Sequence, residues 1–555
     1  MTRPASFLLA SALLAALATL PARAESAGQV KLRILAINDF HGNLKPPPGG
    51  IRISDPDDPT KSSVVPAGGA EHMATLVKQL REGHKHTIFV AAGDLIGASP
   101  FLSAMFHDEP TIESMSLMGL ALSSVGNHEF DEGKDELLRT QNGGCHPTDG
   151  CRGPHPFPGA AFHYLAASTI AKDTGKTVFP PYEIKSFEGI PVAFIGLTLK
   201  GTAGIISPAS ADGLEFRDEA ETVNALVPEL KAKGVEAIVV LIHEGGWPTG
   251  GINECPGISG PIVDIVKKFD HAVDLVISGH THQAYVCTID GRLVTSGDKY
   301  GNLVTAIDVT LDPATRDVAS AKADNVIVRT GLPKDPEQTA LIDAYDKLAR
   351  PIAEQPAGEI TETLSRTPNA SGESVLGDVV ADAQLAATAD PEKGGAVIAL
   401  TNPGGIRTDL IRREGGSVTF ADVFASQPFR NQLVTLTLTG AQLKATLEQQ
   451  WTDPARPRIL QVSKGFAYGY DASKQAGARI DAASLKLNGE TIAPGRSYRV
   501  TVNTYLALGG DGFTALKDGS DAQFGKYDDE VLFAYVKASS PVAPPPRDRI
   551  TAMTH

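Results

Sequence analysis

Short apolar runs recur through the first half of the chain, and most of them end on a polar residue that is followed by glycine or a turn. The runs lie at residues 32–37, 87–92, 191–197, 237–242 and 273–277. The segments predicted as helices lie between them, at residues 68–80, 109–119, 219–233 and 260–269. Apolar strands that alternate with helices are typical of layered α/β architectures. The pattern therefore predicts an α/β fold with buried sheets.

Several of these runs end at residue types that bind metal ions. In chain order they are Asp39, His41, Asp94, Asn127, His243, His280 and His282, with His128 and Asp131 beside Asn127 in the segment SSVGNHEFD. Sheets of this class carry their chemistry at the carboxyl ends of the strands, so we expect these side chains to converge. A lone GNHE could be an ordinary turn. Agreement in residue type and position across the segments indicates a site.

Asp94 stands between the other candidate ligands in the sequence. A single aspartate after a strand can be the cap of a helix. A carboxylate between two sets of ligands can also bridge two cations about 3.5 to 4 Å apart, as in two-metal hydrolases. We expect Asp94 to bridge two cations.

Other segments of the first half carry less information. His72, His84, His86 and His107 lie in polar or helical contexts and are set aside as metal ligands. The Pro/Gly/Asp-rich residues 46–63 are predicted to form a surface loop.

The chain is too long for one ordinary domain, so two large units are expected. Residues 335–353 are charged and compatible with a helix, with Asp335 as N-cap and Pro336 at the first helical position. We expect this helix to link a catalytic unit at 25–334 to a second unit at 354–540, which ends in a tail at 541–555. Alternating strand patterns, such as residues 432–439, characterise the second unit.

Composition and net charge limit the classes of molecule that the protein is expected to bind. The chain is 42% hydrophobic and 21% charged, as in globular proteins, and its net charge is -15. Binding to a nucleic-acid polymer depends on basic patches, so such a partner is not expected. A small phosphorylated ligand needs only local positive charge.

The N-terminus predicts export. Residues 1–24 combine Arg3, an Ala/Leu-rich core and the cleavage pattern Ala22-Arg23-Ala24, which together indicate a secretory signal peptide. Later apolar runs are too short to span a bilayer. We expect a secreted protein in the periplasm, without a membrane span.

Four cysteines fit an oxidising compartment. Cys145 and Cys151 flank a Gly/Pro/Asp-rich loop, and Cys255 and Cys287 bracket the segment that contains GHTH. The sequence alone does not choose among the three possible pairings. We favour Cys145 with Cys151 and Cys255 with Cys287; zinc binding is the alternative, but neither pair has C-x-x-C spacing.

The ordered set D-x-H, G-D, G-N-H-E, H and G-H-x-H resembles the calcineurin-like metallophosphoesterases. With the second unit, the chain is similar to the bacterial 5'-nucleotidase and UDP-sugar hydrolase family. The resemblance implies a four-layered α/β/β/α catalytic domain, a linker helix and a smaller α+β substrate-binding domain.

The resemblance also implies two divalent metal ions, each held by its own set of residues. One set is Asp39, His41, His282 and the shared Asp94; the other is Asn127, His243, His280 and Asp94. Nitrogen and oxygen ligands suit zinc, manganese, iron or cobalt, and ligand type does not rank them. His128 would stabilise the transition state or assist the leaving oxygen, and Asp131 would orient His128 and keep it protonated.

Three motifs of the second unit are similar to the nucleotide-binding domain of the family: NPGGIR at 402–407, QPF at 427–429, and Tyr505 followed by GGDGF at 509–513. By resemblance, Phe429 and Tyr505 would sandwich the base, Asn402 would contact it, Asp511 would hold the ribose and Arg407 the phosphate. Propensity alone would make both aromatics core residues. Asn43 and Leu508 depart from the family pattern, which concerns substrate choice and not the metal ligands.

The first expectation for function is a monomeric nucleotide phosphohydrolase, a 5'-nucleotidase or also a UDP-sugar hydrolase. The alternative is a 2',3'-cyclic-nucleotide 2'-phosphodiesterase with 3'-nucleotidase activity. More remote alternatives are a thiosulfohydrolase and a non-catalytic exported binding protein, although the complete ligand set argues against the latter.

Overall fold

The computed structural model describes residues 28–54 and 61–553. The signal peptide expected at residues 1–24 lies outside the described residues. The N-terminal unit contains two six-stranded sheets, each with a parallel centre. The first consists, in spatial order, of β17 (Asp317–Ile327), β16 (Leu303–Asp312), β1 (Val30–Ile37), β4 (His86–Ala91), β5 (Leu122–Ser124) and β6 (His163–Leu165). The second consists of β14 (Ala284–Ile289), β15 (Arg292–Gly297), β13 (Leu275–Ser278), β12 (Ala237–His243), β10 (Ile190–Thr198) and β9 (Tyr182–Phe187).

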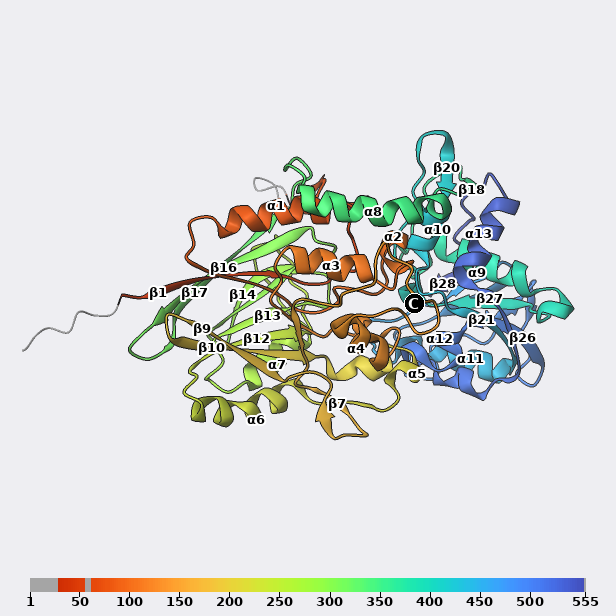
Figure 1. Ribbon diagram of the computed structural model, residues 1–555. Coiled ribbons are helices and arrows are strands. Elements are labelled where there is room, and N and C mark those ends of the chain that lie inside the picture. The colour runs from red at the N-terminus through yellow and green to blue at the C-terminus, as the bar shows by residue number, and fades with distance from the viewer. Residues whose placement is uncertain (1–27, 55–60, 554–555) are drawn as a thin grey trace, which may run out of the picture.

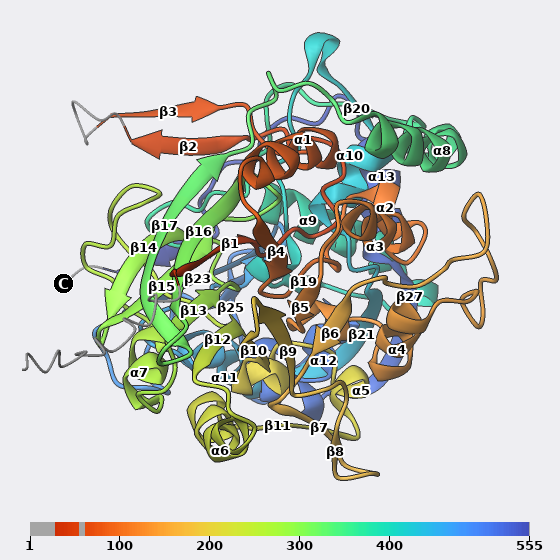
Figure 2. The same ribbon diagram turned by 60° about the vertical axis from the view of Figure 1, so that its left-hand side comes forward.

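Successive side chains of each strand point to opposite faces, which builds a layered core. In β1, Leu32 and Ile34 share a buried cluster with β12 of the other sheet, whereas Leu35 and Ile37 face helices α1 (Ala70–Arg81) and α3 (Glu109–Leu117). In β12, Val240 faces α6 (Glu219–Ala232) and α7 (Pro261–Lys268). The two sheets thus lie between two helical layers (Figure 2), which confirms the predicted α/β/β/α arrangement. Burial of each such side chain stabilises the fold by about 1.5 to 3 kcal/mol.

The segment at 46–63 differs from the predicted loop. The structure has β2 (Ile51–Ser54) paired antiparallel with β3 (Ser62–Val65), and the pair projects from the body of the unit (Figure 2). Its β-branched residues favour a hairpin, a signal that the surrounding Pro and Gly residues obscured.

Helix α8 (Pro336–Ala353) connects the two units (Figure 1). As predicted, the Asp335 carboxylate caps it by accepting hydrogen bonds from the N–H groups of Glu337 and Gln338, both at 3.2 Å. Its other end joins an apolar cluster with Phe101 and with Phe424 of α10 (Phe420–Ser426). The helix therefore packs on both units and fixes their relative position.

The second unit is built on a five-stranded sheet with helices on both faces. Its order is β22 (Gln461–Val462), β19 (Ile398–Thr401), β26 (Ser497–Asn503), β21 (Gln432–Thr439) and β27 (Ser520–Tyr527). Helices α9 (Val375–Thr388) and α13 (Asp528–Ala538) share one buried cluster with Leu433 of β21. Helix α11 (Gly440–Glu448) packs against Leu436 and Leu438 on the other face.

A tail was predicted at 541–555, and its described residues, 541–553, pack onto this unit. Strand β28 (Ile550–Ala552) pairs in parallel with β23 (Phe466–Tyr470). Beside it, the Arg549 guanidinium donates to both carboxylate oxygens of Asp382, at 2.7 and 2.9 Å, and both side chains are largely buried.

Both favoured disulfides are present, Cys145–Cys151 and Cys255–Cys287. Among the residues that the structure describes, no helix has the length and apolar character needed to cross a membrane.

Candidate metal centre and substrate cleft

The predicted metal ligands meet at one edge of the two sheets. Strands β1, β4, β12 and β13 end there. Strand β12 ends on His243, and the residues after the other three strands supply Asp39, His41, Asp94, His280 and His282. Asn127 follows β5. Asp39, His41 and His243 are fully buried. The convergence expected from the strand ends is what the structure has.

The backbone is strained at most of these positions. Positive φ angles occur at five of the seven candidate ligands, namely Asp39 (50°), His41 (47°), Asp94 (50°), His280 (69°) and His282 (54°). Such conformations cost non-glycine residues of the order of 1 to 3 kcal/mol each and gather at functional sites. Backbone hydrogen bonds hold them, for example from the N–H of Asp39 to the Gly93 carbonyl at 3.0 Å.

One group of ligands consists of Asp39, His41 and His282. The Nε2 atoms of the two histidines lie 3.0 Å apart, and Asp39 Oδ1 lies 3.4 Å from His282 Nε2 and 3.9 Å from His41 Nε2. Asp94 Oδ2 lies 3.7 Å from His41 Nε2. These separations suit ligand atoms that surround one cation.

The other group is centred on His243. Its Nε2 lies 3.0 Å from Asp94 Oδ2 and 3.2 Å from the side-chain oxygen of Asn127. The His280 ring lies edge-on to the His243 ring, with centroids 5.1 Å apart. Asp94 Oδ2 is therefore close to both His41 and His243, and this carboxylate belongs to both groups of candidate ligands.

The residues around the ligands fix which ring nitrogens are free. Nδ1 of His41 donates to the Gly97 carbonyl at 2.9 Å and Nδ1 of His243 donates to the Ala92 carbonyl at 2.8 Å, so in the neutral form of each ring Nε2 carries the lone pair toward the centre. Burial lowers the pKa of His41 and of His282, and lowers that of His280 to about 3, which keeps these rings neutral. Lone pairs and carboxylates that face one another in a buried space fit divalent cations.

His243 differs from the other histidines. Burial is the largest single effect and lowers its pKa, but the Asp94 and Asp39 carboxylates and the Ala92 carbonyl together raise the pKa to about 10. The two carboxylates of the centre therefore attract positive charge to this point, which a cation supplies in a metal-loaded protein.

Glu129 and Asn38 hydrogen-bond to the candidate ligands or their loops, and neither was predicted from the sequence as a site residue. The Glu129 carboxylate accepts hydrogen bonds from the backbone N–H groups of Asp94 (2.9 Å), Leu95 (2.8 Å) and Gly126 (2.6 Å). Asn38 donates to Asp39 Oδ2 at 2.7 Å. Glu129 thus joins the loops after β4 and β5, and its place in GNHE was the available signal.

His128 and Asp131 form a pair beside the ligands. His128 Nδ1 lies 2.7 Å from Asp131 Oδ2, and its ring centroid lies 5.0 Å from that of His41. Burial lowers the pKa of His128, but the Asp131 and Asp94 carboxylates outweigh burial and raise it. Among the described residues, His128 also lies close enough to His41 and Asp94 for the three to share an ion.

The second unit reaches this pair directly. Phe429 stacks on the His128 ring, with centroids 5.7 Å apart and planes 17° apart. The Arg407 guanidinium lies 5.8 Å from the centre of the Phe429 ring. Its charge acts to lower the pKa of His41, His128 and His282, behind the larger effect of burial, so this cation faces the metal centre.

A cavity of about 290 Å³ lies between the two units. The first unit lines it with Asn127, His128, Asp131, Ile205, Ile206, Ser207 and His280. The second lines it with Asn402, Gly404, Gly405, Arg407, Phe429, Asn431, Arg458, Tyr505 and Asp511. All five candidate substrate-binding residues therefore share one space with His128 and Asp131.

Within the cavity, Asp511 is the centre of a hydrogen-bond network. It accepts from the Tyr505 hydroxyl and from the Asn402 amide, both at 3.0 Å, and its own backbone is left-handed (φ 56°). The Asn402 oxygen accepts from Asn503 at 3.1 Å. In this structure, Asn402 thus positions Asp511 and uses both ends of its amide in doing so.

Arg458 and Asn431 also line the cavity, and neither was predicted from the sequence. Arg458 donates to the Asp511 carbonyl at 3.0 Å, and Asn431 lies two positions after Phe429. Arg458 belongs to no motif, whereas the closeness of Asn431 to Phe429 was a usable signal.

Comparison with known proteins agrees with this geometry. Residues 32–284 match the calcineurin-like phosphoesterase family, and residues 353–518 match the 5'-nucleotidase C-terminal domain family. The chain is 34% identical to the endonuclease YhcR of Bacillus subtilis over 86% of its own length, but it spans only 37% of that protein. It is 31% identical to the cell wall protein Lmo0130 of Listeria monocytogenes, over 92% of this chain and 68% of the relative.

A solved structure is similar over the whole described fold. The 5'-nucleotidase precursor of Thermus thermophilus is 26% identical, with a TM-score of 0.77, and the match covers 95% of this chain and 100% of that chain. The chain matches both domain families and is more than 30% identical to a relative of which it covers over two thirds. The protein therefore belongs to the 5'-nucleotidase family of metal-dependent calcineurin-like phosphoesterases.

Proposed function

We propose that the protein is an exported nucleotide phosphohydrolase that removes the phosphate of nucleoside 5'-monophosphates. The observation that carries the proposal is the cavity in which His128 of the first unit meets Arg407, Phe429 and Tyr505 of the second. Neither unit alone has both the strand-end ligands and the aromatic residues. A substrate would therefore lie between the units.

Two divalent cations would be held by the seven ligands described above, with Asp94 shared. When bound, such ions acidify water and neutralise the charge of a phosphoryl group. The donor set fits them, since Nε2 of His41, and Nε2 of His243 once a cation displaces its proton, face buried carboxylates.

The protein's own side chains would supply the remaining steps. His128, held by Asp131, would donate a hydrogen bond or proton to the phosphoryl or leaving oxygen. Arg407 would bind phosphate oxygens, for which the planar guanidinium is well suited. Phe429 and Tyr505 would hold the base by stacking, which tolerates different bases.

A second candidate is the hydrolysis of phosphodiesters, such as 2',3'-cyclic nucleotides. It is supported by one relative, since the chain is 34% identical to YhcR of B. subtilis, which is named as an endonuclease and so as an enzyme that cleaves phosphodiester bonds. The net charge of -15 supports small substrates over a nucleic-acid polymer.

Export, and location in the periplasm, is part of the proposal. It is supported by the N-terminal sequence pattern and by the two disulfides, which persist in oxidising compartments.

The test is product analysis by chromatography after the purified protein is incubated with AMP, UDP-glucose, 2',3'-cyclic AMP or 3'-AMP, with and without EDTA, because cleavage of UDP-glucose or of the cyclic nucleotide yields a monophosphate and not free phosphate. We expect chelator-sensitive hydrolysis of AMP. Hydrolysis of the cyclic and 3' substrates without AMP hydrolysis would replace the first candidate by the second.

A further inference from the structure

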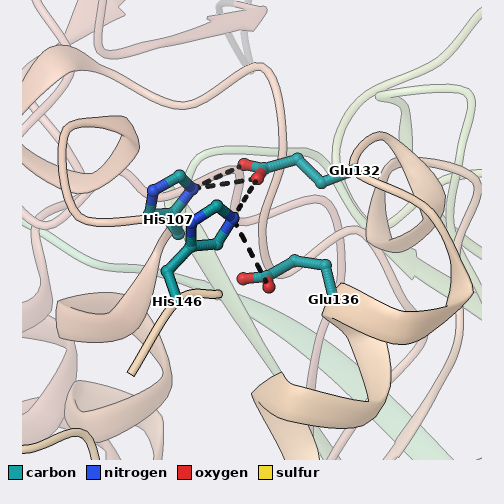
Figure 3. A group of neighbouring side chains, drawn as sticks. All are labelled: His107, Glu132, Glu136 and His146. Atoms are coloured by element: carbon teal, nitrogen blue, oxygen red, sulfur yellow. Dashed lines mark hydrogen bonds and ion pairs between the residues drawn. The ribbon is translucent and has the colours of Figure 1, made fainter. Parts of the chain in front are cut away.

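A second cluster of metal-binding side chains lies outside the centre described above (Figure 3). His107 follows helix α2 (Phe101–Ala104), and Glu132 follows Asp131. Glu136 lies in the first turn of α4 (Lys134–Asn142), and His146 lies in the loop closed by the Cys145–Cys151 disulfide. Four separate parts of the chain thus bring two imidazoles and two carboxylates together.

The four side chains point toward a common centre (Figure 3). Glu132 Oε2 lies 2.9 Å from His107 Nδ1 and 3.7 Å from His146 Nε2. Glu136 Oε2 lies 3.9 Å from His146 Nε2. One ligand atom from each of the four residues lies within 4.8 Å of the others.

Glu132 is hydrogen-bonded to His107, but His146 lies too far from both carboxylates for a hydrogen bond. At 3.7 and 3.9 Å, His146 Nε2 makes no hydrogen bond to either carboxylate. Ligands at about 2.0 to 2.2 Å from a tetrahedral zinc ion lie about 3.3 to 3.6 Å from one another. The His146 separations are close to that spacing.

The two imidazole rings are stacked, with centroids 3.8 Å apart and planes 5° apart. Two positively charged rings in this arrangement would repel each other. Burial lowers the pKa of His107, but the Glu132 and Asp149 carboxylates together raise it, so a cation bound here would take the place of a proton, and one ring would turn out of the parallel stack to reach it.

Neighbouring groups hold the four side chains. Asp149 Oδ2 lies 3.0 Å from His107 Nε2, and Glu132 Oε2 lies 2.9 Å from His107 Nδ1, so an ion at Nδ1 would replace a proton. Arg139 donates to both oxygens of Glu136, at 2.6 and 2.9 Å, and fixes this carboxylate. Nδ1 of His146 accepts a hydrogen bond from the Asp149 N–H at 3.2 Å, which an ion at Nε2 would break.

Burial is compatible with a structural ion. The side chains of His107 and His146 are 14% exposed, that of Glu136 is 12% exposed, and only Glu132 is more open, at 49%. A cavity of about 500 Å³ is lined by His107, Glu132 and Glu136, and also by His128 and Asp131. An ion here would therefore brace the loop that carries the catalytic pair.

We propose that His107, Glu132, Glu136 and His146 bind a third divalent transition-metal ion, with Asp149 as the residue that orients His107. Two imidazoles and two carboxylates form a donor set that suits zinc. The proposal does not depend on which substrate the protein hydrolyses.

The test is the zinc content of the mature protein after equilibration with buffered Zn²⁺ and removal of loosely bound metal, measured by elemental analysis. The parent is expected to hold one more zinc ion per chain than either His107→Gln or His146→Gln. His155→Gln is the matched control, because His155 lies just beyond the same loop, is 47% exposed and contacts only Glu113 among the acidic groups. It is expected to keep the parent's content.

Glu136→Gln repeats the test with a change of nearly equal size, so that one poorly folded variant does not decide the result. Melting temperatures with Zn²⁺ and with EDTA accompany each count. Equal zinc content in the parent and in all three variants would overturn the proposal. Lowered melting temperatures at equal zinc content would assign the cluster to an ion-pair network, which also overturns it. AMP hydrolysis, measured on the same samples, reports separately on the proposed function.

Discussion

Replacing Arg407 by methionine tests whether the second unit takes part in binding phosphate. The change removes the charge and keeps a side chain of similar length, so the packing of the cavity wall is largely retained. Arg407 is the cavity cation whose charge is felt by His41, His128 and His282, and it lies over the Phe429 ring. It therefore faces the position that a phosphoryl group would take.

The size of the effect follows from the interaction that is lost. Hydrogen bonds to charged groups contribute about 1.5 to 3 kcal/mol. At about 1.4 kcal/mol per factor of ten, kcat/KM should fall about 10- to 150-fold. The same factor is expected for AMP and for p-nitrophenyl phosphate, because both carry the phosphate and only one carries a base.

The assay is phosphate release from both substrates, with the metal content measured on the same samples. Arg412→Met is the control, since Arg412 is an exposed arginine of the same segment. A loss below twofold for Arg407→Met, or a loss confined to AMP, would refute the phosphate role.

Three further predictions use other parts of the site and fold. Phe429→Ala should raise KM for AMP, since stacking contributes about 1 to 3 kcal/mol per base, and should leave p-nitrophenyl phosphate nearly unaffected; equal losses with a lowered melting temperature would make Phe429 a core residue instead. His128→Asn should lower kcat about 10²- to 10⁴-fold with metal content unchanged, whereas loss of one metal in elemental analysis would make His128 a ligand. Arg549→Met should destabilise the fold by about 3 to 5 kcal/mol, because Asp382 would be left as a buried charge without its partner; an unchanged urea midpoint would contradict this.

The metal centre was predictable because its ligands follow apolar strands. Asp39, Asp94 and His243 lie at strand ends that the hydrophobic pattern locates, and parallel strands bring those ends to one edge. The backbone strain at Asp39 and Asp94 was not predictable, since residue type does not reveal a positive φ angle.

Residues whose role depends on loop conformation escaped the sequence analysis. His107 was set aside, yet the structure places it against Glu132 and His146, which come from separate segments. Arg458 likewise reaches the cavity through a contact with the Asp511 backbone that no local pattern encodes. The Asn402 amide was expected to contact a base, but in the structure it is already hydrogen-bonded to Asp511 and Asn503.

Asp94 lies between both groups of candidate ligands, so the proposed metal-dependent activity depends on it most. It is tested by phosphate release from AMP with EDTA-treated protein, before and after Mn²⁺ or Zn²⁺ is restored, for the parent and for Asp94→Asn. We expect no release without metal, recovery in the parent, and activity lower by orders of magnitude in a folded Asp94→Asn protein, because the shared carboxylate charge is lost. Full activity in the metal-stripped parent, or in Asp94→Asn, would contradict the proposed metal-dependent hydrolysis.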